Sequence, residues 1–337
     1  MTDTQQQQLI AWGHNPGQAA VKDTFDTAGG KRGETTPYPA VIAPWERSDD
    51  IGLSSSASRA PVLEAVVGGA RYLGGTKAAR MPGAIRQMAN GRLHEDSPVY
   101  PAFAQMSLAH TRLGQRLTEE APAQLVIATA LPVGWRTEDA QGAIERHIRT
   151  GLRGRAQIRM VYVRSEPSAV VYHELLLDDG SIRSDQQDLV KSLVCVADIG
   201  GSTLNRAVLE RIEALPGQSE SPLLGSRRAI DRLMSQADMS FVDAEARLRA
   251  AVEQPGSDPA ADLILRQYAE AVVAELQQAW NIYKPAAYLF AGGTVLWVAD
   301  ALRRAFGPKA RIVEKPQQAI ATGLWRYARM KIARGLR

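Results

Sequence analysis

The chain has 337 residues, of which 45% are hydrophobic and 23% are charged, and its formal net charge is +4. This composition is ordinary for a soluble globular protein, and the length predicts two domains or one two-lobed domain. So small a positive charge is by itself weak support for nucleic-acid binding. Cys195 is the only cysteine, which excludes an internal disulfide framework and favours a small core residue in a reducing, cytoplasmic location.

The N-terminal residues MTDTQQQQ lack the basic and then apolar segments of a signal peptide. We expect them to form a short lead without regular structure. No apolar run approaches the roughly 18 residues that span a bilayer, so we expect no direct membrane insertion.

The first half of the chain alternates strand and helix patterns, which predicts an α/β fold. In chain order we expect a hairpin of strands at 8–12 and 19–26 with a turn at 13–18, loop at 27–35, extended chain at 38–45, an exposed loop at 46–60, a hairpin within 60–75, a helix at 98–118, a buried strand at 123–132, an amphipathic helix with Thr137 as its N-cap, a strand at 158–167 and a helix at 166–177.

The second half repeats this alternation. We expect strands at 193–199 and 205–213, helical segments at 225–253 and 259–284, a strand at 286–293, a helix at 296–306, a short strand at 310–315 and a final helix from Pro316. The segments LIAWGHNPGQAAV and CVADIGGSTLNRAV both place a glycine after a buried strand and before a second strand. Their likeness suggests an internal duplication.

The segment from Leu193 to Glu210 carries the clearest candidate site. Gly200 and Gly201 permit a turn whose N–H groups converge on an anion, and the hydroxyls of Ser202 and Thr203 follow directly. Asp198, at the end of the strand, would repel a phosphate but suits a hydrated Mg²⁺. The alternative is a tight β-hairpin with a solvent-facing aspartate.

Two further segments are candidates for the same chemistry. Gly292 and Gly293 end a strand and precede a helical pattern, as suits a nucleotide, although ordinary strand–helix packing uses the same residues. Glu166 lies between a strand and a helix, where a carboxylate can orient a water for attack on a phosphate. Its alternative role is to stabilise the N-terminus of that helix.

Taken in order, these segments resemble the nucleotide site of the actin, heat-shock chaperone and sugar kinase superfamily. VADIGGSTLNRAV is similar to its second phosphate loop, SEPSAVVY to its first connecting helix, LFAGGTVLWVADALRRAF to its adenosine motif and KPQQAIATGLW to its second connecting segment. TPYPAVIAP, ARYLGGTKAAR, DSPVYPAFAQMSLAH and ATALPVGWRTEDAQGAIERHI resemble the bacterial ParM/StbA-like actins, which segregate plasmids. The resemblance covers most of residues 8–327.

The resemblance implies a two-lobed actin-like fold of duplicated ribonuclease H-like domains, with ATP or GTP and Mg²⁺ between the lobes. Lobe I would span residues 1–190, with a C-terminal helix at 318–337 packed back on it, and lobe II residues 191–317. Nucleotide state would set lobe closure, and protomers would stack head to tail into filaments. A DNA-binding adaptor protein is the further partner that it implies.

The resemblance also implies a role for each matching residue. Asp198 would hold the metal's water shell, and Glu166 would position the attacking water. The residues that would contact the nucleotide are Gly200, Gly201, Ser202 and Thr203 at the β- and γ-phosphates, Gly292, Gly293 and Thr294 at the adenosine, Gly225 to Arg228 near the ribose and base, and Gly13, Asn15, Gly17, Gln18 and Lys22 in the first phosphate loop.

Two positions depart from the family pattern. The first phosphate loop normally carries an aspartate two residues before its first glycine, and we place Ala11 at that position. Loss of this carboxylate would weaken Mg²⁺ positioning and slow hydrolysis, with His14 or Asn15 as hydrogen-bonding substitutes. Asn205 stands where relatives often carry an aspartate. A slowly hydrolysing filament and a non-hydrolysing one therefore both stay open.

Other functions on the same fold predict different features. A small-molecule kinase would need a catalytic aspartate in the first lobe, and a chaperone-like ATPase would usually append a peptide-binding domain. A membrane-tethered division actin would need an amphipathic terminal helix, and the C-terminal segment has only a modest apolar stripe. Its basic residues either contact an acidic partner or complement the helix dipole; they are Arg326, Arg329, Lys331, Arg334 and Arg337.

Overall fold

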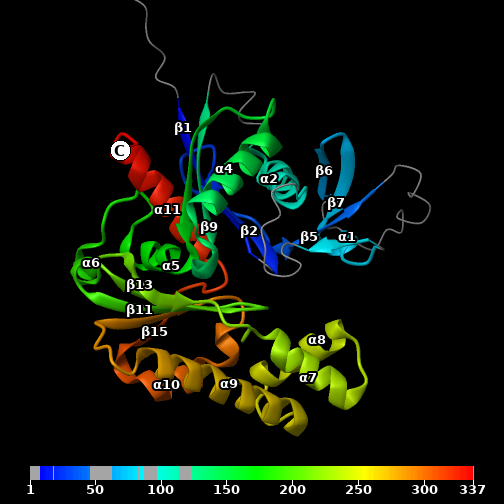
Figure 1. Ribbon diagram of the computed structural model, residues 1–337, viewed down its shortest axis with the longest axis vertical. Coiled ribbons are helices and arrows are strands. Elements are labelled where there is room, and N and C mark those ends of the chain that lie inside the picture. The colour runs from blue at the N-terminus through cyan, green and yellow to red at the C-terminus, as the bar shows by residue number, and fades with distance from the viewer. Residues whose placement is uncertain are drawn as a thin grey trace, which may run out of the picture.

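The computed structural model describes residues 8–17, 19–45, 63–81, 83–86, 97–113 and 123–336. The exposed loop expected at 46–60 lies outside these residues, as does the end of the helix expected at 98–118. Two central sheets lie one above the other, and a third sheet and a helix pair project from them on the same side (Figure 1).

The first central sheet has six strands. Its strand order is β10 (Ile158–Ser165), β9 (Gln124–Leu131), β1 (Leu9–Pro16), β2 (Ala20–Asp26) and β3 (Arg32–Glu34), with β4 (Tyr38–Pro39) paired to β2. β1 and β9 are apolar and buried along nearly their whole length, as expected for central strands covered on both faces. The hairpin expected near the N-terminus is confirmed, but β1 continues through Pro16, so its turn is shorter than the sequence predicts.

The second central sheet has five strands. Its order is β13 (Glu213–Glu220), β12 (Leu204–Glu210), β11 (Leu193–Ile199), β14 (Ala287–Ala291) and β15 (Ala310–Ile312). In both central sheets a hairpin is followed across the sheet by two parallel strands, and a further antiparallel strand continues the other edge. The shared order and directions confirm the internal duplication that the two similar segments suggested.

The third sheet is smaller and contains the hairpin expected within residues 60–75. Its order is β6 (Leu63–Val67), β7 (Ala70–Gly74), β5 (Val41–Pro44) and β8 (Ile85–Arg86), and the short helix α1 (Gly75–Ala78) follows β7. Helix α2 (Val99–His110) packs against it through Phe103 and Met106, both fully buried. This core joins the third sheet to β2 through Val21.

Helices from both ends of the chain cover the first central sheet. α4 (Glu138–Leu152) packs on α2 and β10, and the Thr137 side chain caps it by accepting from the Ala140 N–H, as predicted. α11 (Ala319–Ala333) packs against β1 and against α5 (Glu166–Leu175), so the end of the chain returns to its beginning. The short helices between α5 and β11 are the 3-10 turn η4 (Ser184–Gln186) and α6 (Gln187–Lys191).

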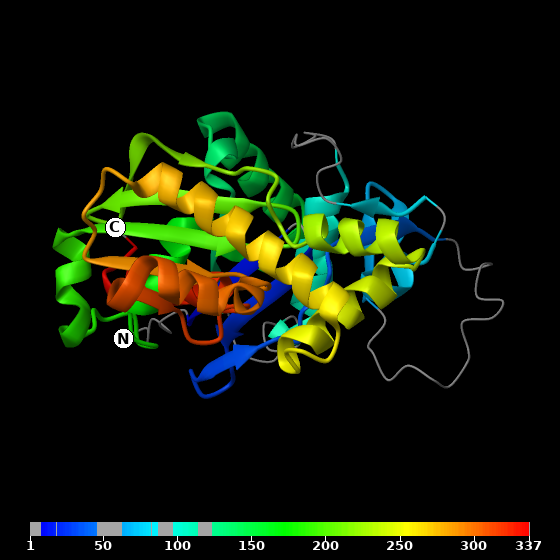
Figure 2. The same ribbon diagram turned by 90° about the horizontal axis from the view of Figure 1, so that it is seen from below.

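Four helices lie between β13 and α11 in the described chain: the first two form the projecting helix pair, and the last two cover the outer face of the second central sheet (Figure 1). They are α7 (Arg227–Ala237), α8 (Phe241–Glu253), α9 (Pro259–Trp280) and α10 (Ala299–Phe306), of which α9 runs along the sheet (Figure 2). The remaining 3-10 turns are η3 (Val133–Trp135), η5 (Val295–Trp297) and η6 (Gly307–Lys309). In the described part of the chain, no helix has the length and apolarity needed to cross a bilayer.

Three expectations for the second half are wrong in detail. The strand expected at 205–213 is a hairpin of β12 and β13, because Arg211 and Ile212 take positive φ and reverse the chain. The helix expected at 225–253 is two helices, broken where Asp238 adopts the left-handed conformation at a φ of 44°. The helix expected from residue 296 begins at Ala299, after η5.

Candidate nucleotide site

Two equivalent hairpins, one from each central sheet, carry the candidate site. In the first, Asn15 of β1 pairs with Lys22 of β2; in the second, Asp198 of β11 pairs with Asn205 of β12. Each pair is separated by the same number of residues. The structure therefore makes Asn15 the counterpart of Asp198, and Lys22 the counterpart of Asn205.

The turns of these hairpins lie against each other. Gly17 and Gly200 are at equivalent positions in the two hairpins, two residues after Asn15 and Asp198 respectively. A Cβ built on Gly201 would lie 3.0 Å from the Cβ of Ala19, so the second turn approaches the first as closely as a glycine permits. Gln18, also predicted to bind nucleotide, lies outside the described residues.

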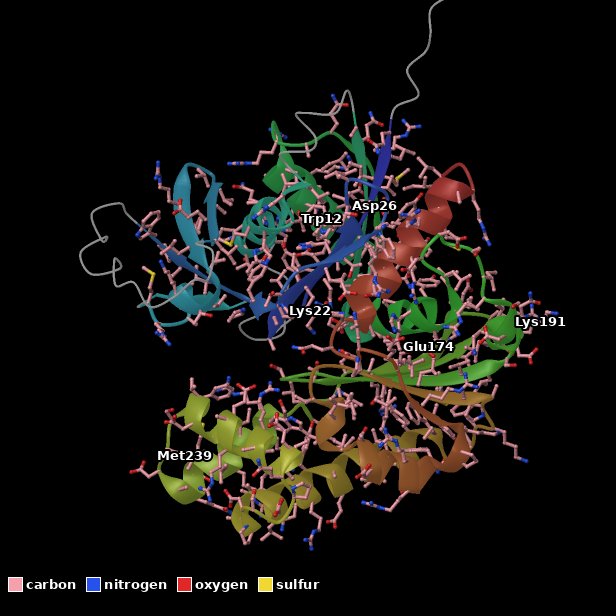
Figure 3. All side chains as sticks on the ribbon, turned by 180° about the vertical axis from the view of Figure 1, so that it is seen from behind. Trp12, Lys22, Asp26, Glu174, Lys191 and Met239 are labelled. Atoms are coloured by element: carbon pink, nitrogen blue, oxygen red, sulfur yellow. The ribbon has the colours of Figure 1, made fainter. Side chains whose placement is uncertain are left out.

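Polar side chains from both sheets meet beside these turns. Asn205 donates from its Nδ2 to the Glu166 carboxylate and lies 3.4 Å from Asp198 Oδ2. Glu166 begins α5, whose N-cap Ser165 accepts from the Ser168 N–H. Figure 3 shows Lys22 at the end of β2 that lies toward the second central sheet. The predicted residues Glu166, Asp198 and Lys22 are thus brought together.

Burial shifts all three titratable groups toward their neutral forms. It raises the pKa of Glu166 to about 8, aided by the Asp198 charge and opposed by Lys22 and the Asn205 hydrogen bond. It also raises the pKa of Asp198, and it lowers the pKa of Lys22 against the attraction of both carboxylates. Two buried carboxyl groups held beside each other favour a cation near them.

Asp198 is 6% exposed, so the alternative of a solvent-facing aspartate is wrong. The Gly200 N–H donates to the Thr203 carbonyl and closes the turn. Among the described residues, no group accepts a hydrogen bond from the N–H of Gly201, Ser202 or Thr203. Three successive amides without partners suit an oxyanion.

The N-terminus of α7 holds the outer side of this turn. The N–H groups of Gly225, Ser226 and Arg227 donate to carbonyls of the turn at 2.8 to 3.2 Å. A side chain on Gly225 would strike the Gly201 carbonyl, which explains the glycine by packing. Arg228 lies exposed in the first turn of α7. Sequence reasoning singled out Gly225 and Arg228 but missed the hydrogen bonds through which the start of α7 fixes the turn.

The segment after β14, at residues 292–294, packs against the residue that precedes this turn, Ile199. Gly292 has a φ of 107°, and a Cβ there would lie 2.2 Å from the Ile199 carbonyl oxygen. The Thr294 hydroxyl lies 2.9 Å from that same oxygen and donates to it, so the structure uses this hydroxyl to hold the turn. Gly293 has open space beside it, apart from Gln317 at 3.9 Å.

The first hairpin differs from the loop that the sequence predicts. Gly13 lies in the middle of β1, and a Cβ there would be 2.1 Å from the Ala321 carbonyl oxygen, so this glycine serves the close approach of α11. The loop glycine is Gly17, and the position two residues before it is Asn15 rather than Ala11. Asn15 is 2% exposed, and its Oδ1 has no hydrogen-bond partner among the described residues.

The equivalence of Asn15 and Asp198 is visible in the sequence. The spacing from Asn15 to Lys22 repeats that from Asp198 to Asn205, and aligning the two similar segments on this spacing places Asn15 opposite Asp198.

Two cations of the C-terminal helix form ion pairs within the fold. Arg326 binds Asp178 and the His173 carbonyl, and Arg329 binds Asp26 at 2.8 Å. Arg337 lies outside the described residues. Asp23 in β2 also has partners within the fold: it accepts a hydrogen bond from Trp12 Nε1 at 2.9 Å and contacts His14 Nδ1.

Cys195 is a buried core residue, as expected, and burial raises the pKa of its thiol to about 12.

No protein-family model and no curated protein matches this sequence. Solved structures match the whole chain at low identity. The apo psk41 ParM protein has a TM-score of 0.70 at 13% identity, covering 97% of this chain and 98% of its own. Ta0583, an archaeal actin homolog, has a TM-score of 0.67 at 16% identity and covers 96% and 99%. This chain has an actin-like fold.

A third match to this actin-like fold carries a nucleotide. Bacillus thuringiensis ParM, solved with ATP, has a TM-score of 0.64 at 15% identity, covering 98% of this chain and 100% of its own. The same protein was also solved with AMPPNP and with ADP. The duplicated sheets, facing hairpins and returning C-terminal helix described above are therefore the parts of an actin-like fold in this chain.

Proposed function

We propose that this protein is a nucleotide-dependent, polymerising actin-like protein that binds ATP or GTP with Mg²⁺ and hydrolyses it slowly. The observation that carries the proposal is the pair of facing hairpins, which brings Lys22, Asn15 and Asp198 together beside three unpartnered amides. Structures of similar fold that hold ATP and ADP support the choice of ligand.

The chemistry of these residues fits a triphosphate and its metal. The N–H groups of Gly201 to Thr203 and the Lys22 ammonium supply donors and positive charge for phosphate oxygens. Among the described residues, no three His, Cys, Asp or Glu side chains gather as a metal cluster. A Mg²⁺ beside Asp198 would therefore take most of its ligands from phosphate and water, as this ion commonly does.

Glu166 is the residue that would act on the attacking water. Its position at the start of α5, fixed by the Ser165 cap and by Asn205, sets its carboxylate in the same cluster as Asp198. The ionised carboxylate is the form that accepts a proton, and its raised pKa limits that form at neutral pH. Asn15, where the equivalent hairpin has Asp198, leaves the site with one carboxylate fewer. Both features favour slow turnover.

Polymerisation and a cellular role are extensions of this proposal. Head-to-tail contacts between identical protomers give open filaments. Movement of DNA, such as a plasmid, through a DNA-binding adaptor is the role that we propose for such a filament in the cytoplasm. The similarity of the fold to ParM proteins supports this choice, and low sequence identity leaves the cargo to experiment.

The test is light scattering of the full chain after addition of Mg-ATP or Mg-GTP, with phosphate release followed in the same sample. We expect scattering to rise within the mixing time and to decay as phosphate accumulates. Glu166→Gln should polymerise normally but release phosphate at least tenfold more slowly. A scattering rise without phosphate would restrict the proposal to a non-hydrolysing filament. Absence of scattering, with turnover only on adding a hydroxylated small molecule, would replace it by the kinase function.

A further inference from the structure

The outer edge of the first central sheet is formed by β10. This strand is last in the sheet order and pairs only with β9 among the described residues. A parallel strand presents alternate N–H and C=O groups on each side, so the unpaired side of β10 offers backbone donors and acceptors to another chain. Natural edge strands are usually protected, and an open one that is several residues long calls for an occupant.

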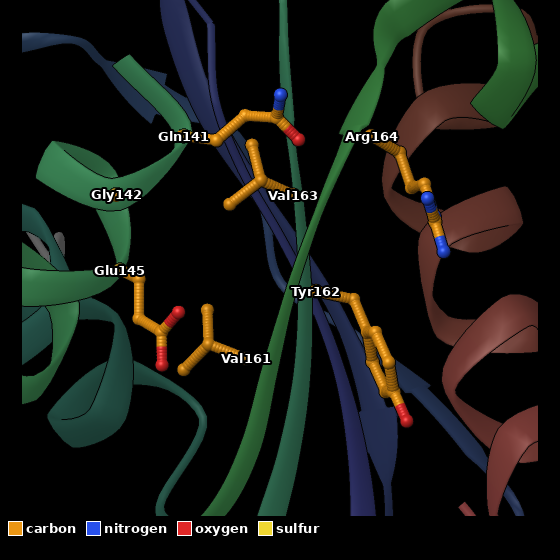
Figure 4. Close-up of a pocket in the computed structure, with 7 residues that line it drawn as sticks. All are labelled: Gln141, Gly142, Glu145, Val161, Tyr162, Val163 and Arg164. Atoms are coloured by element: carbon orange, nitrogen blue, oxygen red, sulfur yellow. The ribbon is translucent and has the colours of Figure 1, made fainter. Parts of the chain in front are cut away.

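A hollow of about 230 Å³ lies along this edge, between β10 and α4. Figure 4 shows its two walls: Gln141, Gly142 and Glu145 on α4, and Val161 and Val163 pointing toward them from β10. Tyr162 and Arg164 point to the opposite face of the strand. The hollow thus has an apolar strand wall and a polar helix wall.

The backbone conformation of Gly142, which lies in α4 and lines the hollow, does not require a glycine. It lies inside a regular helix and does not take positive φ, so any residue fits its backbone. A glycine there costs the helix about 1 kcal/mol relative to alanine. A Cβ would meet only Arg146 Nη1, at 3.3 Å, which is the flexible end of a side chain. What this glycine provides is space beside the edge of β10.

Positive charge is concentrated in β10 and in the segment that leads to it from α4. Between Ile144 and Arg164 the sequence has six arginines and one acidic residue, Glu145. Glu145 is paired with Arg149 at 2.8 Å. In the described part of the chain, no acidic side chain pairs with the four exposed arginines of this region, which are Arg146, Arg153, Arg155 and Arg159.

We infer that the outer edge of β10 binds an extended, acidic segment of a partner protein as an added strand, with an apolar side chain of that segment in the hollow beside Gly142. Main-chain hydrogen bonds to β10 would give affinity, and the hollow and the arginines would give specificity. A nucleic acid would use the arginines alone, since phosphate contacts need neither a strand edge nor an apolar hollow. The inference does not depend on nucleotide binding.

The test uses a fluorescent, end-capped heptapeptide of alternating glutamate and valine, titrated with the full chain at low and physiological salt. We expect saturable binding and slower amide exchange in β10. Gly142→Leu should fill the hollow and weaken binding about tenfold, while keeping or raising thermal stability because leucine favours helix. Gly142→Ala, which leaves most of the hollow, should bind nearly as the natural chain does.

Arg159→Glu should weaken binding roughly fivefold, whereas Arg266→Glu, the same charge change on exposed α9, should not. A peptide methylated on alternate backbone nitrogens should lose binding, because it cannot pair with the strand. Equal binding of the methylated peptide, or no effect of Gly142→Leu, would overturn the inference. Tighter binding of a 24-base-pair DNA duplex with the same arginine dependence would also overturn it, and would assign this surface to nucleic acid.

Discussion

Glu166 combines three features that are rarely found in one carboxyl group. It is 6% exposed, it faces a second buried carboxyl group, and it accepts a hydrogen bond from Asn205. Burial and the Asp198 charge outweigh Lys22 and that hydrogen bond, so the pKa rises to about 8. The folded protein without nucleotide therefore holds a proton at neutral pH that the unfolded chain gives up.

This proton makes the stability of the nucleotide-free protein depend on pH. The folded-state pKa of Glu166 lies above its ordinary value of 4.5, so its contribution is present in acid and is lost as pH rises toward 8. We expect the free energy of unfolding to fall between pH 5.5 and 8.5, and Glu166→Gln to reduce that fall. Urea unfolding at several pH values measures both slopes. Equal slopes would show that Glu166 ionises normally in the folded protein.

Whereas Glu166→Gln removes an ionisable group from the site, a substitution at Asn15 can add one. Because Asn15 is the counterpart of Asp198, Asn15→Asp should place a second carboxylate beside the metal that Asp198 is proposed to hold. We expect calorimetry to show a stronger dependence of ATP binding on Mg²⁺, and lower stability without nucleotide. Asn15→Ala is the matched control, and it should not strengthen the dependence of ATP binding on Mg²⁺. An unchanged Mg²⁺ dependence in Asn15→Asp would remove Asn15 from the site.

At the residue scale, motif spacing predicted the residues whose chemistry does not depend on where a strand ends. Asp198 and Glu166 follow from their types and neighbours, and the structure brings them together. The first loop was misplaced because β1 carries a glycine in its middle, and a sequence does not distinguish a loop glycine from one that admits a helix. The hydrogen bond of the Thr294 hydroxyl was not foreseen, because its acceptor, Ile199, is far away in the sequence, and the contact of Thr294 with a nucleotide stays a prediction.

At the scale of elements, helix α11 is fixed by two glycines at close contacts. Gly13 faces the Ala321 carbonyl from β1, and Gly323 of α11 faces the Ala169 carbonyl of α5 at a Cβ distance of 1.9 Å. Both obstacles are backbone atoms that cannot rotate away. The helix consequently lies deep between the two elements, with Trp325 fully buried and bonded to Asp26.

Enlarging either glycine should therefore destabilise the protein. We expect Gly13→Ala to lower the free energy of unfolding by about 1–3 kcal/mol, the usual range for an overfilled core. Denaturant unfolding checks this. Gly29→Ala, with nothing within 4 Å of its Cβ position, is the control and should change little. A neutral Gly13→Ala would mean that α11 sits farther from β1 than described here.

Elements with strong local signals were predictable and others were not. The N-cap at Thr137 and the hairpin of β6 and β7 are visible in the sequence because their turn and cap residues are characteristic. The reversal at Arg211 and Ile212 and the break at Asp238 occur at residues other than glycine with positive φ. None of them is the glycine that usually marks a positive φ, so these reversals had no clear local signal.

At the scale of the molecule, the two central sheets share a core with α5 and α11, and their hairpin turns approach each other at Gly201 and Ala19. Gly201→Val should separate these turns, because even a Cβ would lie 3.0 Å from the Cβ of Ala19. We expect ATP affinity to fall at least tenfold with little change in thermal stability. Gly29→Val, at an exposed turn, is the matched control. Unchanged affinity in Gly201→Val would show that the nucleotide does not bind between the hairpins.

The path of the chain between the two central sheets limits how they can move. The chain passes from the first sheet to the second between α5 and β11, and returns between β15 and α11. The first passage contains η4 and α6, and the second, at residues 313–318, is tied by hydrogen bonds at Val313, Pro316 and Gln318. Helices α5 and α11, which adjoin these passages, also share one buried core with strands of both central sheets, so the sheets are held together on that side. A movement of one sheet relative to the other would therefore change the separation at the opposite side, between the hairpin turns, where we propose that the nucleotide binds.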